Sequence, residues 1–205
     1  MRYRVLLAVA AAAAVWVGQA GAADAPRSIA GFTLRQPVAE AADRVLMQTA
    51  LPVRYVENLH EVEIRPVDGF KSGLIAYGTC RQPETVVRIK LKYADGSRAF
   101  YDDLLKRYKA RIGNPDEYRG DPFGLFVSWK WSFADANGDR ISLTLQHNQD
   151  DEDEKLGNAV KLTLVNRMEE DAQCARQQPD PRRALRMTEP PPRPSTEWDR
   201  LVPKR

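Results

Sequence analysis

The stretch Leu125–His147, LFVSWKWSFADANGDRISLTLQH, decides the fold of this 205-residue chain. Apolar and polar residues alternate on both sides of a central turn segment, a period of two that is typical of strands with one buried face. The turn segment, Asp135–Asp139, contains Asn137-Gly138, and this pair favours the positive φ angles of a tight hairpin. The sequence therefore predicts two antiparallel strands joined by a short turn.

Other segments on both sides of this hairpin are also predicted as strands. Thr85–Tyr93 and Ala159–Arg167 alternate with a period of two, and Leu74–Cys80 is a short apolar strand. The first two make a second hairpin. Val62–Val67 is a possible strand, and Pro66 would confine it to a sheet edge, while Gly69–Gly73 reads as a turn. Asp116–Gly124 is a loop or a short strand.

Two segments carry helical patterns instead. Pro37–Thr49 has an alanine-rich start and an apolar stripe at helical spacing, and it stops before Pro52. Ala99–Ile112 also has apolar residues at helical spacing, with Ser97 placed to cap its first turn. Glycine and proline follow this second segment directly, so the sequence predicts two helices with well-defined ends.

This element order predicts an α+β fold in which helices pack on one face of antiparallel sheet. A tandem of two helix-plus-three-strand units is an alternative that no residue-level repeat decides. Over Ser28–Arg167 the element order resembles that of the barrel-machinery assembly lipoprotein of the outer membrane and of exported β-lactamase inhibitor proteins. The resemblance shares no motif, and fold analogy does not carry function.

The N-terminus has the pattern of a signal peptide over residues 1–22. Arg2 and Arg4 precede the apolar run Val5–Val17, and Ala20-Gly21-Ala22 provides a small-residue cleavage site. An uncleaved membrane anchor is the alternative, although a spanning helix needs about 20 apolar residues. We therefore expect export to the bacterial periplasm, with a mature chain that starts at Ala23 and contains no transmembrane span.

The charge of the chain is unevenly distributed. The formal net charge is +3, but the last thirty residues contain eight basic and four acidic side chains, so the region Ala23–Ala175 is net acidic. We expect one folded domain over residues 23–175 and a disordered, proline- and arginine-rich tail over 176–205. The positive charge therefore belongs to the two ends of the chain and does not indicate a nucleic-acid partner.

The chain contains two cysteines, Cys80 and Cys174. In an oxidising compartment an even pair predicts a disulfide. Neither cysteine belongs to a CxxC motif or has a nearby histidine, which argues against metal ligation and redox chemistry.

No motif indicates catalysis, a cofactor or a metal. The chain lacks a nucleophile elbow, a phosphate-binding loop and a dinucleotide fingerprint. His147 continues the apolar face of its strand and is interpreted as structural rather than as a general base. Asp135, Asn137 and Asp139 resemble the start of a calcium loop, but the glycine and the final ligand are misplaced, so a hairpin turn is favoured.

Two faces of the predicted sheet are candidates for binding. Trp129 and Trp131 share a face and could line a groove, although core packing beneath Ala99–Ile112 is the favoured interpretation. The opposite face is polar and basic. Its cationic residues are Arg88, Lys90, Lys92, Lys130 and Lys161. An ordinary solvated sheet face is the alternative, because only strand register would align these charges.

The sequence therefore favours an exported, non-enzymatic binding or accessory protein of the cell envelope. Its expected partner is an envelope protein or an anionic envelope component that contacts the basic face. One alternative is a small periplasmic enzyme whose site is assembled from residues that are distant in the sequence. Another is a structural or assembly accessory protein that acts through its basic, proline-rich tail.

Overall fold

A computed structural model describes residues 25–54, 56–149 and 157–178. The strands are β1 (Ser28–Ile29), β2 (Phe32–Thr33), β3 (Val45–Val53), β4 (Val56–Ile64), β5 (Phe70–Gly78), β6 (Val86–Tyr93), β7 (Glu117–Gly120), β8 (Phe126–Ala134), β9 (Arg140–Asn148) and β10 (Gly157–Leu164). The helices are a short 3₁₀ helix at Val38–Ala41, α1 (Arg98–Ile112) and α2 (Val165–Gln177). The described residues therefore form a large antiparallel sheet with two α-helices, which is compatible with the predicted α+β class.

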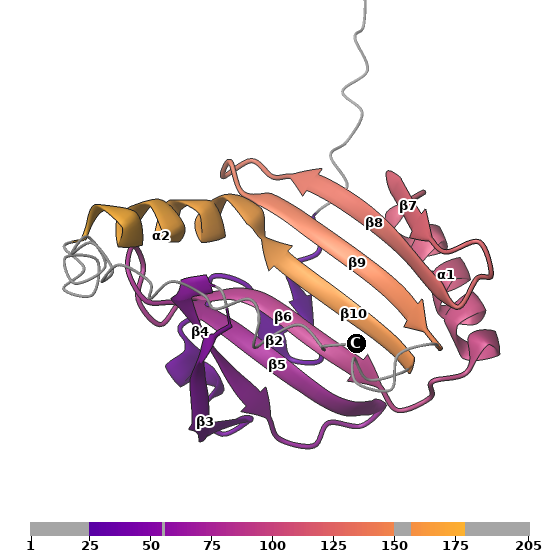
Figure 1. Cartoon of the computed structure of the whole chain (residues 1–205), viewed down its shortest axis with the longest axis horizontal. Helices are drawn as coiled ribbons and strands as arrows, with labels where there is room; N and C mark the ends of the chain where they lie inside the picture. Colours follow the sequence, from indigo (N-terminus) through magenta and orange to yellow (C-terminus); the bar gives the residue numbers. More distant parts are fainter. Residues whose placement is uncertain (1–24, 55, 150–156, 179–205) are drawn as a thin grey trace, which may run out of the picture.

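Eight strands form one sheet in the order β3-β4-β5-β6-β10-β9-β8-β7 (Figure 1). β3 to β6 follow one another as a meander that ends in α1, and β7 to β10 form a second meander that ends in α2. The two meanders meet where β6 pairs antiparallel with β10. Residues from both halves of the chain therefore lie side by side at this central pair of strands.

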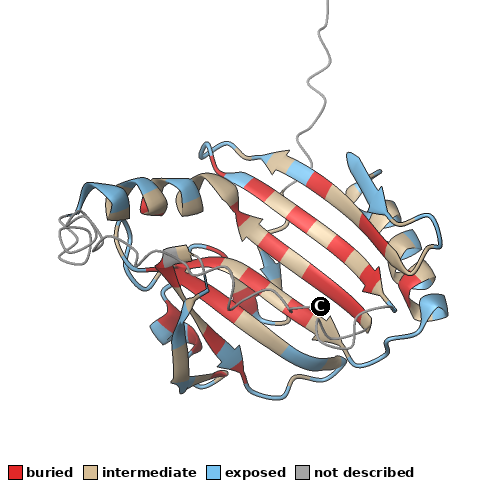
Figure 2. Cartoon of the chain, viewed as in Figure 1, coloured by how far each residue is buried: buried red, intermediate tan, exposed pale blue. Residues whose placement is uncertain are grey.

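One face of the sheet carries the hydrophobic core. Alternate residues of the central strands are fully buried there, and Figure 2 shows the resulting bands along β8, β9 and β10. α1 packs on this face, where the Tyr108 and Trp131 ring centroids lie 5.9 Å apart and the Trp131 indole donates to the Gly113 carbonyl. Burying a large apolar side chain contributes about 1.5–3 kcal/mol, so this layer dominates the stability of the fold.

The other side of the sheet, which carries Lys90, Lys130 and Lys161, is called the open face below. In Figure 1 α1 lies behind β8, so the view is onto the open face. The N-terminal hairpin β1–β2 also lies on the buried side. Phe32 is 1% exposed, and the hairpin residues Ser28–Gly31 line a cavity together with Leu104 and Tyr108 of α1. Both elements therefore lie on the buried side, and among the described residues neither of them covers the centre of the open face.

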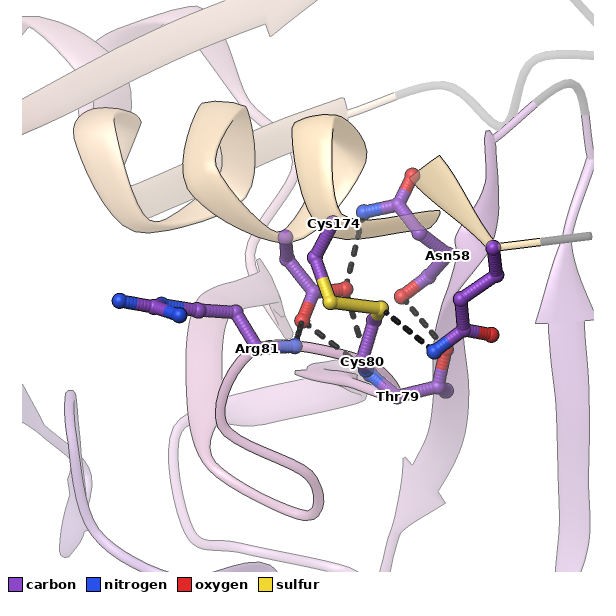
Figure 3. Close-up of a disulfide and its surroundings, with 7 residues drawn as sticks. Asn58, Thr79, Cys80, Arg81 and Cys174 are labelled. Carbon is purple, nitrogen blue, oxygen red and sulfur yellow. Dashed lines mark hydrogen bonds between the residues drawn. A yellow bond between two sulfur atoms is a disulfide. The ribbon is translucent and has the colours of Figure 1, made fainter. Parts of the chain in front are cut away.

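α2 runs across one end of the sheet, where it contacts β4, β6 and β9. The predicted disulfide joins this helix to the segment after β5, with the Cα atoms of Cys80 and Cys174 5.9 Å apart (Figure 3). The bond closes a loop of 94 residues, which the chain-entropy treatment values at about 4–5 kcal/mol. The disulfide therefore links α2 covalently to the first meander.

Asp171 fixes α2 beside the disulfide. Its buried carboxylate accepts backbone hydrogen bonds from Cys80 and Arg81, at 3.0 and 2.7 Å, and a side-chain hydrogen bond from Asn58. A Cβ atom on Gly78 would lie 2.9 Å from Asp171 Oδ1, so this approach requires glycine. Hydrogen bonds to a charged group are worth about 1.5–3 kcal/mol each, which makes this contact a strong anchor.

The helix predicted over Pro37–Thr49 is wrong. Only Val38–Ala41 is helical, as a 3₁₀ turn, and β3 begins at Val45 and pairs with β4. Pairing with a neighbouring strand outweighs the helix propensity of the alanines, a weak local preference that tertiary contacts override. Pro52 is tolerated because β3 is an edge strand.

Two other predicted boundaries are also corrected. β4 is an internal strand rather than an edge, because it ends at Ile64 and leaves Pro66 in the following connection. The segment predicted as a turn over Gly69–Gly73 belongs mostly to β5, which starts at Phe70.

The last predicted strand is also too long. It ends at Leu164, and Val165–Gln177 forms α2, which extends two residues into the segment assigned to the tail. The expected signal peptide, residues 1–22, and the rest of the tail lie outside the described residues. No helix in the described ranges has the length and hydropathy needed to cross a membrane.

Candidate functional site

Strand register aligns the predicted basic residues on the open face. One cross-strand row passes through all eight strands of the sheet. From edge to edge the row consists of Leu46, Glu63, Leu74, Lys90, Lys161, Thr144, Lys130 and Glu117. Three of the five predicted cations therefore share one row. Arg88 lies one row away, opposite Thr163, and Lys92 lies on the other side, opposite Ala159.

The centre of this row is a pair of directly opposed lysines. Lys90 of β6 and Lys161 of β10 are Cα partners at the junction of the two meanders. Like charges directly opposite each other in a sheet are destabilising, by about 0.2–1 kcal/mol per pair. The fold therefore carries an electrostatic cost at this position.

Acidic side chains compensate the outer cations but not the central ones. Lys130 Nζ lies 3.1 Å from Glu117 Oε1, and Arg88 Nη2 lies 3.7 Å from Glu61 Oε2. Within the described ranges, Lys90 and Lys161 form no hydrogen bond or ion pair. Among the residues that the structure describes, the positive charge is thus unbalanced at the middle of the open face.

These surroundings lower the pKa of Lys161. Partial burial lowers the pKa of its ammonium group below the ordinary value, and the charges of Arg88, Lys90, Arg119 and Lys130 lower it further. Arg119 of β7 was not predicted as part of this face, because Asp116–Gly124 shows too little alternation to assign a strand. The position of Arg119 depends on the pairing of β7 with β8.

A cavity of about 390 Å³ opens on this face beside Lys161. Its lining residues are Glu117, Arg119, Phe126, Ser128, Lys130, Ser142, Thr144, Gln146, Lys161, Thr163 and Val165. A second cavity, of about 350 Å³, lies on the other side of the lysine pair and includes Lys90 and Lys92. Both volumes are within the range of small-molecule sites, roughly 300–1,000 Å³.

The tryptophans and the buried histidine have structural contacts instead. Trp131 is 2% exposed beneath α1, while Trp129 is half-buried between Lys109 and Tyr118. His147 Nδ1 lies 2.7 Å from Asn158 Oδ1, and the Asn158 amide donates to two backbone carbonyls at the start of α1. Because that amide nitrogen is the donor, its oxygen accepts and the proton lies on His147 Nδ1.

The carboxylate of Asp139, in the turn between β8 and β9, is held by three arginines. It is fully buried, and Arg27, Arg35 and Arg167 lie 2.9, 3.1 and 3.2 Å from its oxygens. Asp135 pairs with Arg27 as well, and it accepts backbone hydrogen bonds from Asn137 and Asp139, as the hairpin interpretation requires. In the described ranges, no group of three or more histidine, cysteine or acidic residues is arranged to hold a metal.

Comparison with protein families, with curated proteins and with solved structures found no match to this chain. The residues themselves must therefore support any functional conclusion. They form a basic, polar and concave site at the junction of the two meanders.

Proposed function

We propose that this chain is an exported, non-enzymatic binding protein of the cell envelope that recognises an anionic partner through its open face. The observation that carries the proposal is the opposed pair Lys90–Lys161, which has no acidic partner in the described part of the chain. An arrangement that costs folding energy persists more readily where function requires it. An anion between the two ammonium groups would remove their repulsion.

Two further features support export. The Cys80–Cys174 disulfide is typical of an oxidising compartment, and the N-terminal sequence has the composition of a signal peptide. Together they favour the periplasm.

We also propose that the two meanders are tandem units. Each has four strands followed by a helix, in place of the helix and three strands that the sequence suggested. β6 and β10 are the fourth strands of their units, and they pair with Lys90 opposite Lys161. Equivalent strands meeting in an antiparallel pair are what a pseudo-two-fold arrangement would produce. In this arrangement the Lys90–Lys161 pair would lie on the pseudo-axis, with one of the two cavities on each unit.

The proposal is tested by reversing the charge on the open face. Wild-type protein should show a higher Tm in citrate or in a carboxylated polysaccharide, because a ligand that binds only the folded state stabilises it. The variant carrying Lys90→Glu and Lys130→Glu should lose this increase. Lys106→Glu is the matched control, because Lys106 lies on the exposed side of α1 and its ion pair within the described residues is with Asp103.

The result of this experiment decides the proposal. Retention of the ligand-dependent Tm increase in the double variant would show that the open face does not bind the anion. Absence of any increase in the wild type across the anions would overturn the proposal altogether.

An enzyme is the second candidate function, and the lowered pKa of Lys161 favours it. A lysine with a lowered pKa is a better amine nucleophile. It could attack a carbonyl carbon and form an imine with loss of water. Borohydride reduction in the presence of a carbonyl compound would then leave a mass increase on wild-type protein and none on Lys161→Met.

A further inference from the structure

The polar side chains that line the cavity beside Lys161 have unused hydrogen-bonding capacity. The neutral members are Ser128, Ser142, Thr144, Gln146 and Thr163. In the described ranges, none of these side chains makes a hydrogen bond. Serine, threonine and glutamine side chains can both donate and accept, so the cavity presents several neutral hydrogen-bonding groups to one ligand.

The charged groups of the cavity are arranged differently from the neutral ones. Lys161 lies at the inner side, next to Lys90, and has no ion pair in the described residues. Lys130 and Arg119 both contact Glu117 on the edge strand, so their charges are partly satisfied. The cavity thus presents one unsatisfied cationic centre surrounded by neutral hydroxyl and amide groups.

This combination selects among anionic ligands. A fatty acid would bury its chain against polar groups, because Phe126 and Val165 are the only apolar residues in the lining. An inorganic anion would satisfy the lysine and leave the hydroxyl groups to water. A sugar acid has one negative charge, several hydroxyl groups that donate and accept, and a C–H face that Phe126 could cover.

We infer that the cavity beside Lys161 is a binding site for a sugar acid, with the carboxylate at Lys161 and the sugar hydroxyls at Thr144, Ser142 and Gln146. This inference rests on the proposed function, since it names the ligand class of the same open face. The second cavity, beside Lys90, extends the face and would leave room for a neighbouring unit of a chain.

The test is titration calorimetry of the full chain with four compounds. These are galacturonate, its neutral parent galactose, inorganic phosphate and penta-aspartate. We expect galacturonate to bind at least ten-fold more tightly than galactose and phosphate, because only galacturonate uses both the charge and the hydroxyl groups. Lys161→Met should abolish binding of galacturonate and phosphate alike.

Two variants test the hydroxyl contacts separately from the charge. Thr144→Val should weaken galacturonate binding about 2–10-fold, the value of one neutral hydrogen bond, and leave phosphate binding unchanged. Ser142→Ala should weaken galacturonate binding in the same way. Ser132→Ala is the matched control, because Ser132 lies directly opposite Ser142 on the open face but does not line the cavity.

The outcomes separate this inference from the proposed function. Galacturonate binding no tighter than phosphate, or insensitivity to Thr144→Val, would overturn the sugar-acid assignment and leave an anion-binding face. Tighter binding of penta-aspartate would also overturn it, in favour of an acidic peptide. If none of the three anions bound, both proposals would fail.

Discussion

Asp139 and Lys161 are both charged and at least partly buried, but the charges that surround them differ. Asp139 is surrounded by three arginines that come from the N-terminal segment and from α2. Lys161 is surrounded by four basic residues and has no acidic partner in the described ranges. Asp135 also pairs with Arg27 and Glu170 with Arg167, so the first cluster contains three carboxylates for its three arginines. Among the described residues, Lys161 has no such partner.

This difference distinguishes a charge that stabilises the fold from a charge that is available to a ligand. A compensated cluster such as that of Asp139 holds distant segments together and leaves nothing for a ligand to add. An uncompensated cluster raises the energy of the folded protein, and an external anion would complete it. The comparison therefore predicts opposite effects of removing each charge.

Removing Asp139 should have the largest effect. Asp139→Ala leaves three arginines without their common partner, and breaking a fully buried pair typically costs about 3–5 kcal/mol. The arginines are partly exposed, with 21–37% of each side chain accessible, so we expect about 2–4 kcal/mol in urea unfolding. Asp68→Ala, at an exposed position, is the control and should change stability by less than about 0.5 kcal/mol. A loss below about 1 kcal/mol for Asp139→Ala would contradict the structural assignment.

Lowering the pH should remove the contribution of Asp139 to the stability of the wild-type protein. Burial opposes ionisation of Asp139, but the three arginines outweigh burial and lower the pKa of this carboxyl. Its contribution to stability is therefore complete above the ordinary pKa of about 3.9 and is lost as the pH falls toward the lowered folded-state pKa. The stability difference between wild type and Asp139→Ala should narrow over that range. A constant difference down to pH 2 would show that the arginines do not act through ionised Asp139.

Removing Lys161 should have the smallest effect, and with the opposite sign. Lys161→Met eliminates the repulsion with Lys90 while keeping a side chain of similar length. We expect an unchanged or higher unfolding free energy, by up to about 1 kcal/mol, together with loss of anion binding. Lys106→Met on α1 provides the matched control. A loss of more than about 1 kcal/mol would mean that Lys161 is structural, like Asp139.

Regular alternation made the C-terminal half of the sheet predictable. The hairpin of β8 and β9 follows the sequence pattern almost residue for residue, from Phe126↔Asn148 to Ala134↔Arg140. α1 was also predictable, because Ser97 caps its first turn and Gly113 follows its last residue. In these segments local preference and tertiary packing agree.

The errors lie where local preference and tertiary packing disagree. Val45–Val53 follows an alanine-rich segment with a helical stripe, and only its pairing with β4 makes it a strand. α2 was missed because the alternation of β10 was extended through Arg167. Val165, Met168 and Ala172 lie at helical spacing and would have indicated the helix.

The two charge clusters were not equally visible in the sequence. The basic face follows from strand alternation alone, although its centre at Lys90 and Lys161 depends on a register between strands about 70 residues apart. The Asp139 cluster joins residues separated by 104 and 112 positions through an irregular N-terminal segment. No local sequence pattern predicts such a contact, so Asp139 was interpreted only as a turn residue.

The disulfide has a consequence for proteolysis. Every peptide bond between Cys80 and Cys174 belongs to a covalent ring, and that ring includes both strands of the central β6–β10 pair. A protease that cuts one connection within the ring produces a nicked protein rather than two fragments. Lys90 and Lys161 would stay joined through the sulfur atoms until a reductant separates them.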